Sequence, residues 1–394
     1  MHGRVRHLPP RSTPSALLSG ELSVRPIQSL DELEQGPLAQ SYRRFCAALP
    51  GFGSLGFDPA FLRVAKPAFT RSGERVWFLA VMDGADMIAL APFLRLVRGR
   101  APLRFRQLRL WGKSGRYVEY PIVSLLALEG AESAGIRAVT DALEGPYASE
   151  WDELVLKHIG REDPFLAALS ARFTVSSDPD PEDPDKGDHM HLFGSHEHID
   201  EKLNSENRRR IRKTEERMRE EFSCVEMVTV EAPDDALIDE LRQLHIARQH
   251  DLIEEGRPRI SFFEDPVENR ATIDMMRVAQ EAGGLRVHLL RIDGSVVGFW
   301  ICFAAGGYAQ AAITAVSPVP GHKYASSWLW RHMLVTEAER YGTKWLDAMW
   351  GSHMLKRKFS NTLVPIRSRV LQNNAGALAR APLGALGLVR RLKG

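Results

Sequence analysis

Candidate catalytic side chains lie close together in the last quarter of the chain. Asp347 falls within a short apolar run, and His353 and Lys356 follow it within nine residues. A carboxylate or a neutral imidazole can orient an amine or take its proton, and a lysine can stabilise an oxyanion or bind a phosphate. These three residues are therefore the catalytic candidates. The alternatives are that backbone N–H groups at a strand edge satisfy Asp347 and that Lys356 is a solvated surface lysine.

A second group of candidates precedes them. The loop 317–324 contains two prolines and Gly321, which disfavour a helix, and Ser326 and Ser327 occupy positions typical of an N-cap. Apolar residues then recur at helical spacing up to Tyr341, and 344–350 is expected to be a strand. A loop followed by a helix can offer backbone N–H groups to a phosphate. The cofactor-binding candidates in this loop and helix start are His322, Lys323, Ser326 and Ser327.

The stretch 314–359 resembles the C-terminal signature of GNAT acyltransferases of the BioF2-like and CelD type, which are related to the FemAB peptidoglycan transferases. The positions that fit this signature are Gly342, Asp347, Gly351, Lys356 and Phe359. Leu355 replaces the tyrosine of the signature, and Ala325–Ser327 replaces its Ser-Pro-Gly. The Arg/Gln-x-x-Gly-x-Gly/Ala loop of ordinary GNAT enzymes is absent.

This resemblance implies an N-acyltransferase that uses an acyl-CoA, most simply acetyl-CoA. It implies an α/β fold of two tandem GNAT-like domains, each a mixed sheet flanked by helices. In such sheets a backbone N–H of a splayed central strand polarises the thioester carbonyl. The strand expected at 310–316 would serve here, which adds Ala315 and Val316 to the cofactor-binding candidates. The implied acceptor is an amino sugar or lipid-linked sugar in bacterial exopolysaccharide (holdfast-like) or cell-envelope biosynthesis.

The sequence also contains two copies of one pattern. Apolar runs around Asp83-Gly84 and around Asp293-Gly294 predict two β-hairpins, and a helix and a strand follow each one. This echo favours a duplication, as in FemAB-type proteins. The expected organisation is a disordered N-terminus (1–20), a degenerate GNAT-like domain (21–175), a linker (176–198), a GNAT acyltransferase domain (199–375) and a basic apolar tail (376–394).

Acceptor-binding candidates lie in both expected domains. Glu119 and Tyr120 resemble the strand and loop of the family that carries an Asp-Tyr pair. The segment 199–221 is expected to be a charged helix. Its piece Asn204–Met218 resembles the family's basic helix, and Arg208, Arg209 and Arg212 could bind a phosphorylated acceptor. The alternative is a solvated helix with i,i+4 ion pairs such as Arg212–Glu216.

Composition limits the other possibilities. The 394 residues carry a net charge of +2, which does not favour a nucleic-acid partner. The three cysteines are widely spaced, and no run of about 18 apolar residues occurs, so a cytoplasmic protein is expected. Arg390, Arg391 and Lys393 allow a peripheral membrane contact. Four histidines at 189, 191, 196 and 198 lie in a Pro/Asp-rich stretch, and no metal site is predicted there.

Two rival functions remain open. The donor could be an aminoacyl-tRNA, as in FemAB relatives, or an acyl carrier protein; the absence of a second helix to pair with 199–221 argues against the tRNA. Alternatively, the departures at 325–327 and at Leu355 could mark a non-catalytic binding protein with a GNAT fold. The acceptor, the acyl chain length and the oligomeric state stay undetermined at this stage.

Overall fold

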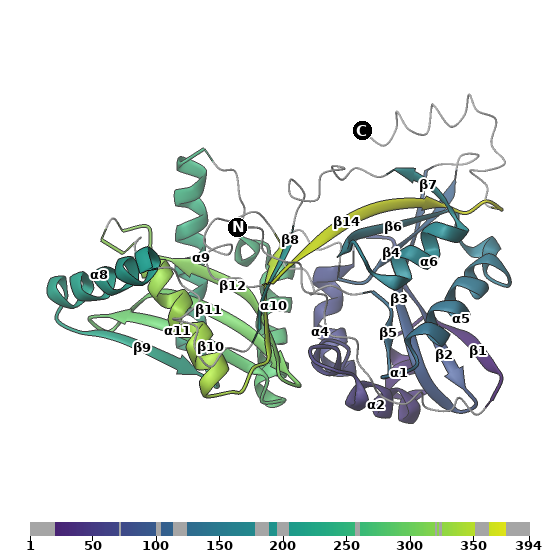
Figure 1. The fold of residues 1–394 in the computed structure, drawn as a ribbon, viewed down its shortest axis with the longest axis horizontal. Helices are drawn as coiled ribbons and strands as arrows, with labels where there is room; N and C mark the ends of the chain where they lie inside the picture. Colours follow the sequence, from purple (N-terminus) through teal and green to yellow (C-terminus); the bar gives the residue numbers. More distant parts are fainter. Residues whose placement is uncertain are drawn as a thin grey trace.

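The computed structural model describes residues 20–70, 72–99, 104–112, 124–177, 189–194, 205–256, 261–319, 321–322, 325–350 and 362–375. These residues form two lobes around one continuous twisted sheet (Figure 1). The expected disordered N-terminus and basic tail lie outside the described residues, apart from Gly20. Among the helices that are described, none is both long enough and apolar enough to cross a lipid bilayer.

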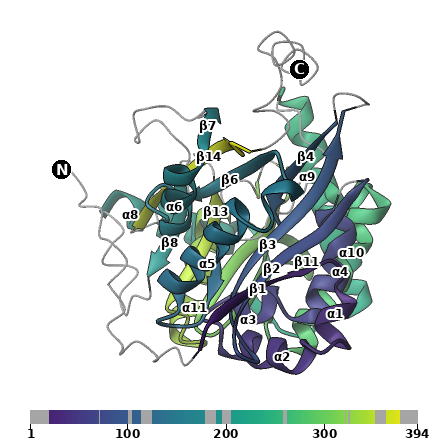
Figure 2. The ribbon, with the colours of Figure 1, turned by 90° about the vertical axis from the view of Figure 1, so that its right-hand side faces the viewer.

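In the N-terminal lobe, the strand order is β1-β2-β3-β4-β6, and only β4 and β6 are parallel to each other. Helices cover both faces of this sheet (Figure 2). The strands are β1 (Leu22–Ile27), β2 (Glu74–Asp83), β3 (Asp86–Arg98), β4 (Phe105–Leu110), β5 (Leu126–Ala127), which pairs with β3, and β6 (Glu153–Gly160). The helices are α1 (Asp31–Glu34), α2 (Ala39–Ala48), α3 (Gly53–Gly56), α4 (Pro59–Phe69), α5 (Glu132–Glu144) and α6 (Pro164–Arg172).

The C-terminal lobe repeats this order as β9-β10-β11-β12-β13, again with only the last pair parallel. Its strands are β9 (Val225–Val230), β10 (Leu285–Ile292), β11 (Ser295–Ala305), β12 (Tyr308–Val316) and β13 (Trp345–Trp350). Its helices are α8 (Ser205–Glu221), α9 (Asp235–Glu254), α10 (Pro266–Glu281) and α11 (Ala325–Glu339). The predicted α/β fold of two similar units is therefore confirmed.

The two lobes exchange a strand. β14 (Thr362–Gln372) follows the C-terminal copy in sequence but pairs antiparallel with β6 of the N-terminal sheet. β8 (His189–Gly194) follows the N-terminal copy but pairs antiparallel with β13. β8 and β14 also pair with each other, and β7 (Thr174–Ser177) pairs with β14 (Figure 1). The stretch expected to be a linker thus contributes a strand to the sheet, while the proposed domain boundaries stay a prediction.

A shared apolar core holds the lobes together. Buried side chains of α1 to α4 pack with those of α9, α10 and β10 to β12 in one cluster. The rings of Phe61 on α4 and Phe303 on β11 meet edge to face at 5.7 Å. Because burial of this apolar surface stabilises both lobes at once, we expect them to unfold as a single cooperative unit.

One expected element differs from the structure. The helix expected from Ser327 begins at Ala325 instead. The N-cap positions assigned to Ser326 and Ser327 were therefore wrong, and both residues lie in the first turn of α11.

Candidate active site

The C-terminal sheet opens between β12 and β13. These parallel strands pair over only three residue pairs, and the last of them is Gln310 with Asp347. β12 then continues to Val316 with β11 as its ladder partner. Within the described strands, the side of β12 beyond Gln310 that faces β13 is therefore unpaired. Such an edge carries N–H and C=O groups that can bond a ligand.

A bulge in each strand shapes this opening. Ile301 pairs with Ile313 and Cys302 pairs with Ala311, so Ala312 is an extra residue in β12. Side chains two residues apart in a regular strand share a face. Because of the extra residue, Ala311 packs beneath α11 and Ile313 packs on the other face, in the core between the lobes. In β13 the pairing with β8 is irregular after Asp347, and Met349 has a φ of +65°. The backbone of each strand therefore changes direction where the two strands separate.

The backbone direction of β12 follows from one hydrogen bond. The N–H of Ser317 donates to the carbonyl of Val297 on the β11 side at 2.8 Å. Because N–H groups alternate along a strand, those of Val316 and Thr314 point to the opposite side, into the opening. Of the two predicted backbone candidates, Val316 faces the opening with its N–H. Ala315 instead directs its N–H toward β11 and its small side chain into the shared core.

Asp347 is fully buried at the base of the opening. The hydroxyl of Tyr308 donates to its Oδ2 at 2.8 Å, and the N–H of Met349 donates to its Oδ1 at 2.7 Å. Burial, together with the neighbouring carboxylate, raises the pKa of Tyr308 well above its usual value, so that its hydroxyl remains a donor. The other two catalytic candidates, His353 and Lys356, lie outside the described residues.

The described residues between β12 and α11 contact one another. The side chain of Ser317 lies 3.0 Å from Nδ1 of His322, whose carbonyl accepts the N–H of Ala325 at 2.9 Å. The imidazole also lies against the ring of Phe222, with 5.5 Å between centroids. Burial lowers the pKa of His322, so at neutral pH it offers hydrogen bonds rather than charge. Lys323 lies outside the described residues, and Ser326 and Ser327 are half-buried at the start of α11.

The predicted basic helix exists as α8, which rests on the α11 side of the sheet through Ile211 and Met218. Arg208, Arg209 and Arg212 are exposed and, with Arg331 of α11, line a groove of about 420 Å³, the α8–α11 groove. Arg212 also approaches Glu216 at 3.6 Å, which is the ion pair expected of a solvated helix. Glu119 and Tyr120 lie outside the described residues.

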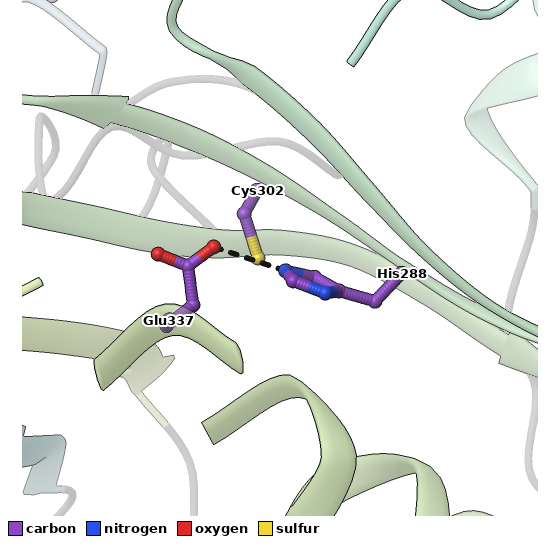
Figure 3. A group of neighbouring side chains, drawn as sticks. All are labelled: His288, Cys302 and Glu337. Carbon is purple, nitrogen blue, oxygen red and sulfur yellow. Dashed lines mark hydrogen bonds and ion pairs between the residues drawn. The ribbon is translucent and has the colours of Figure 1, made fainter. Parts of the chain in front are cut away.

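A buried polar cluster beneath α11 was missed by the sequence analysis. His288 of β10, Cys302 of β11 and Glu337 of α11 bring a nitrogen, a sulfur and an oxygen within 4.8 Å of one another (Figure 3). These are metal-ligand types, but the protein already satisfies the carboxylate and the imidazole. Glu337 accepts from His288 Nε2 at 3.0 Å, from Thr343 at 2.5 Å and from Arg286, while Nδ1 of His288 lies 3.0 Å from the Thr229 hydroxyl.

This cluster braces α11 against the sheet. Burial alone would raise the pKa of Glu337, but the hydrogen bond and charge of His288 and the charge of Arg286 outweigh it and lower that pKa. A charged glutamate is thus held between β10 and α11. The sequence held a signal for it, because a histidine at an inward position of the apolar run 285–292 needs a polar partner.

Comparisons with known proteins support the assignment of the C-terminal half. Residues 205–357 match the family described as "Acetyltransferase (GNAT) domain". Among solved structures, FemX is similar with a TM-score of 0.56 and 11% identity, covering 85% of this chain and 96% of FemX. At these identities the likeness concerns the fold alone.

Two further structures are similar at lower scores. The C-terminal domain of a putative lysylphosphatidylglycerol synthetase from Agrobacterium fabrum has a TM-score of 0.49 and 13% identity, covering 86% of this chain and 93% of that one. A tandem GNAT protein from the clavulanic acid pathway has a TM-score of 0.45 and 12% identity, covering 89% and 98%. No curated protein matches the sequence. Residues 205–357 therefore form a GNAT acetyltransferase domain, and the N-terminal half of the chain repeats the strand order of this domain.

Proposed function

We propose that the protein is an N-acyltransferase that transfers an acyl group, most simply acetyl, from coenzyme A to an amine. The observation that carries this proposal is the opening between β12 and β13, where pairing stops at Gln310 and Asp347 while β12 continues. An extended pantetheine chain can bond the unpaired edge of β12, and the thioester would then lie beside the N–H groups of Thr314 and Val316. This backbone edge is part of the GNAT domain.

The chemistry requires few groups. The acceptor nitrogen attacks the thioester carbon, a C–N bond forms and the C–S bond breaks, and the proton lost by the amine balances the thiolate that leaves. The N–H groups of Val316 and Thr314 would donate to the carbonyl oxygen and stabilise the negative charge that develops on it. Asp347 would orient the acceptor or receive its proton, and His353 and Lys356 are the remaining candidates for the base and for a second oxyanion donor.

The proposed acceptor is an amino sugar or related compound, free or lipid-linked, of bacterial exopolysaccharide or cell-envelope biosynthesis. The α8–α11 groove supports an anionic acceptor, because four arginines line it and a guanidinium pairs with phosphate oxygens in a forked geometry. Glu119 and Tyr120 remain candidates for contacts to the sugar. A lipid-linked acceptor would bring the protein to the inner membrane surface from the cytoplasm.

The test combines an activity screen with a substitution that removes one backbone N–H group. The full chain would be incubated with acetyl-CoA and a panel of amino sugars, amino-sugar nucleotides and lipid-linked amino sugars, with thiol release as the readout. Val316→Pro removes the N–H that faces the opening, whereas Val316→Ala keeps it. Loss of one oxyanion donor lowers kcat by about 100- to 1,000-fold. We expect this loss in the proline variant alone, with both variants folded by circular dichroism.

Other results would redirect the proposal. Turnover at the wild-type rate in a folded Val316→Pro variant would show that the carbonyl is polarised elsewhere. Transfer that needs an aminoacyl-tRNA or an acyl carrier protein in place of coenzyme A would assign the rival donor. If none of these donors reacts and acetyl-CoA does not raise the melting temperature, a non-catalytic binding protein is favoured, because a ligand at 100 times its Kd adds about 2.7 kcal/mol of stability.

A further inference from the structure

We propose that the buried polar cluster beneath α11 binds one zinc ion through His288, Cys302 and Glu337. This inference is independent of the proposed acyl transfer, because these residues lie on β10, β11 and α11 and not on the strands that form the opening. Their side chains point toward one another, and the nitrogen, sulfur and oxygen that they offer lie within 4.8 Å of one another (Figure 3). All three residues are buried, so an ion bound among them would be shielded from solvent.

These three ligands suit zinc better than other divalent ions. Imidazole nitrogen, thiolate sulfur and carboxylate oxygen bind Zn²⁺ at about 2.0–2.3 Å, whereas Mg²⁺ and Ca²⁺ take oxygen ligands. Around a tetrahedral ion such atoms lie roughly 3–4 Å from one another. Nε2 of His288 already lies 3.0 Å from Oε1 of Glu337. The sulfur of Cys302 therefore needs only a small rotation of its side chain to complete the set.

Cys302 gives up little when it binds an ion. Its thiol lies 3.7 Å from Sδ of Met333, and a thioether is a weak hydrogen-bond acceptor. A role as a small apolar filler explains the burial of this cysteine but not its position beside His288 and Glu337. When zinc binds, the thiol releases its proton. The thiolate and the carboxylate of Glu337 then balance the two charges of the ion, as burial requires.

The other two ligands are supported from their far sides. Nδ1 of His288 lies 3.0 Å from the hydroxyl of Thr229, which can accept its proton and so direct Nε2 toward the ion. Oε2 of Glu337 accepts from Thr343 at 2.5 Å and from Arg286, which leaves Oε1 for the ion. Metal-bound histidines and carboxylates are typically oriented by such outer partners. The ion would take the place of the proton that now joins Nε2 to Oε1.

A fourth ligand is available on α11. Nε2 of His332 is buried and has no hydrogen-bond partner among the residues that the structure describes. The ring centroids of His332 and His288 are 6.2 Å apart. Structural zinc sites are almost always four-coordinate, and binding would give this nitrogen the partner that it lacks. Because His332 as a whole is only partly buried, its ring can turn toward the ion without displacing the core.

Metal titration of the full chain tests this site. The protein would be freed of metal with a chelator, and its Zn²⁺ affinity would be measured in competition with a chromophoric chelator. The variants are Cys302→Ala, Thr229→Val and Cys46→Ala, which is the matched control because Cys46 is also a buried thiol but lies on α2. We expect one zinc ion per chain in the wild type and in the control. Thr229→Val should weaken binding by about 10- to 100-fold, as loss of an outer partner does, and Cys302→Ala should weaken it more.

Cobalt identifies the sulfur ligand directly. Co²⁺ in a zinc site gives a charge-transfer band in the near ultraviolet when a thiolate binds it. The chain has three cysteines, so Cys302 is the only thiol in Cys46→Ala/Cys224→Ala. We expect the band to persist in this double variant and to vanish in Cys302→Ala.

Two results would overturn the proposal. Unchanged Zn²⁺ affinity in Cys302→Ala would mean that the ion binds elsewhere, such as at the histidines at 189, 191, 196 and 198. A double variant without the cobalt band would exclude Cys302 as a ligand, and this result decides even if Cys302→Ala does not fold. Acyl transfer is a separate readout, so either failure leaves the proposed function intact.

Discussion

The hydroxyl of Tyr308 on β12 donates a 2.8 Å hydrogen bond to Oδ2 of Asp347 on β13, at the base of the opening between these strands. Asp347 thereby ties the two walls of the candidate site together, and its second oxygen accepts the N–H of Met349 in the bulge of β13. The residue that the family spacing marks as catalytic is also a structural anchor. A variant of Asp347 must therefore be read for stability and turnover together.

Asp347→Ala should lower the free energy of unfolding by about 1–3 kcal/mol, because it leaves the Tyr308 hydroxyl and the Met349 N–H buried without their acceptor. Turnover should fall as well. Tyr308→Phe is the control, since it breaks the bond between the strands but keeps the carboxylate. If Asp347 acts on the acceptor, only its own variant will lose most of kcat. Equal kcat values in the two variants would show that Asp347 has a structural role alone.

Contact between the lobes should also influence the site. Gly51 has a φ of +58°, and a Cβ there would meet the Cβ of Tyr308 at 3.2 Å. Gly84 has a φ of +59° with nothing within 4 Å of the same point. Alanine at either position costs about 1–2 kcal/mol through backbone strain. We expect Gly51→Ala to lose additional stability and to slow acyl transfer, whereas Gly84→Ala shows the backbone cost alone. Equal losses in denaturant unfolding and equal rates would contradict this coupling.

The brace beneath α11 predicts that replacing Glu337 lowers the free energy of unfolding far more than replacing Glu339 on the same helix. Glu337→Ala should lower the free energy of unfolding by about 3–5 kcal/mol, because it leaves the partly buried Arg286 and the fully buried His288 without their carboxylate. Glu339→Ala, on the exposed side of α11, should change it by less than about 0.5 kcal/mol. Urea unfolding measures both. A Glu337 variant that is as stable as the Glu339 variant would refute the brace.

Acid should destabilise the protein before its carboxylates titrate. Burial lowers the pKa of His245 to about 4 from 6.5, opposed by the charge of Glu264. A folded pKa below the unfolded one means that this stability is complete above about pH 6.5 and is lost as the pH falls towards 4. The full loss is about 3 kcal/mol. His245→Gln should flatten the curve of unfolding free energy against pH between pH 7 and 5. An unchanged slope in the His245 variant would contradict this account.

The sequence predicted the local features of the fold but not the pairing between distant segments. The hairpin at Asp293-Gly294 was predictable, because a type I′ turn requires a positive φ at both central residues and favours Asp-Gly there. The observed φ values are 48° and 86°. Asp347 was marked by its spacing, but its partner Tyr308 lies 39 residues earlier and has no local signal. The sequence around β8 is typical of a linker, because prolines and aspartates precede it and its run of six residues is short. Only the structure reveals that β8 and β14 each complete the sheet of the other copy.

This exchange of strands predicts that neither half folds alone. A fragment ending at residue 200 lacks β14, so β6 becomes an open edge, and it also loses the C-terminal share of the common core. We expect each separate half to aggregate or to melt without a cooperative transition. Co-expression of 1–200 with 201–394 is the control, because it keeps every strand and breaks only the chain. The pair should co-purify and melt cooperatively, and a soluble, cooperatively melting N-terminal fragment would show that the exchanged strand and the shared core are dispensable.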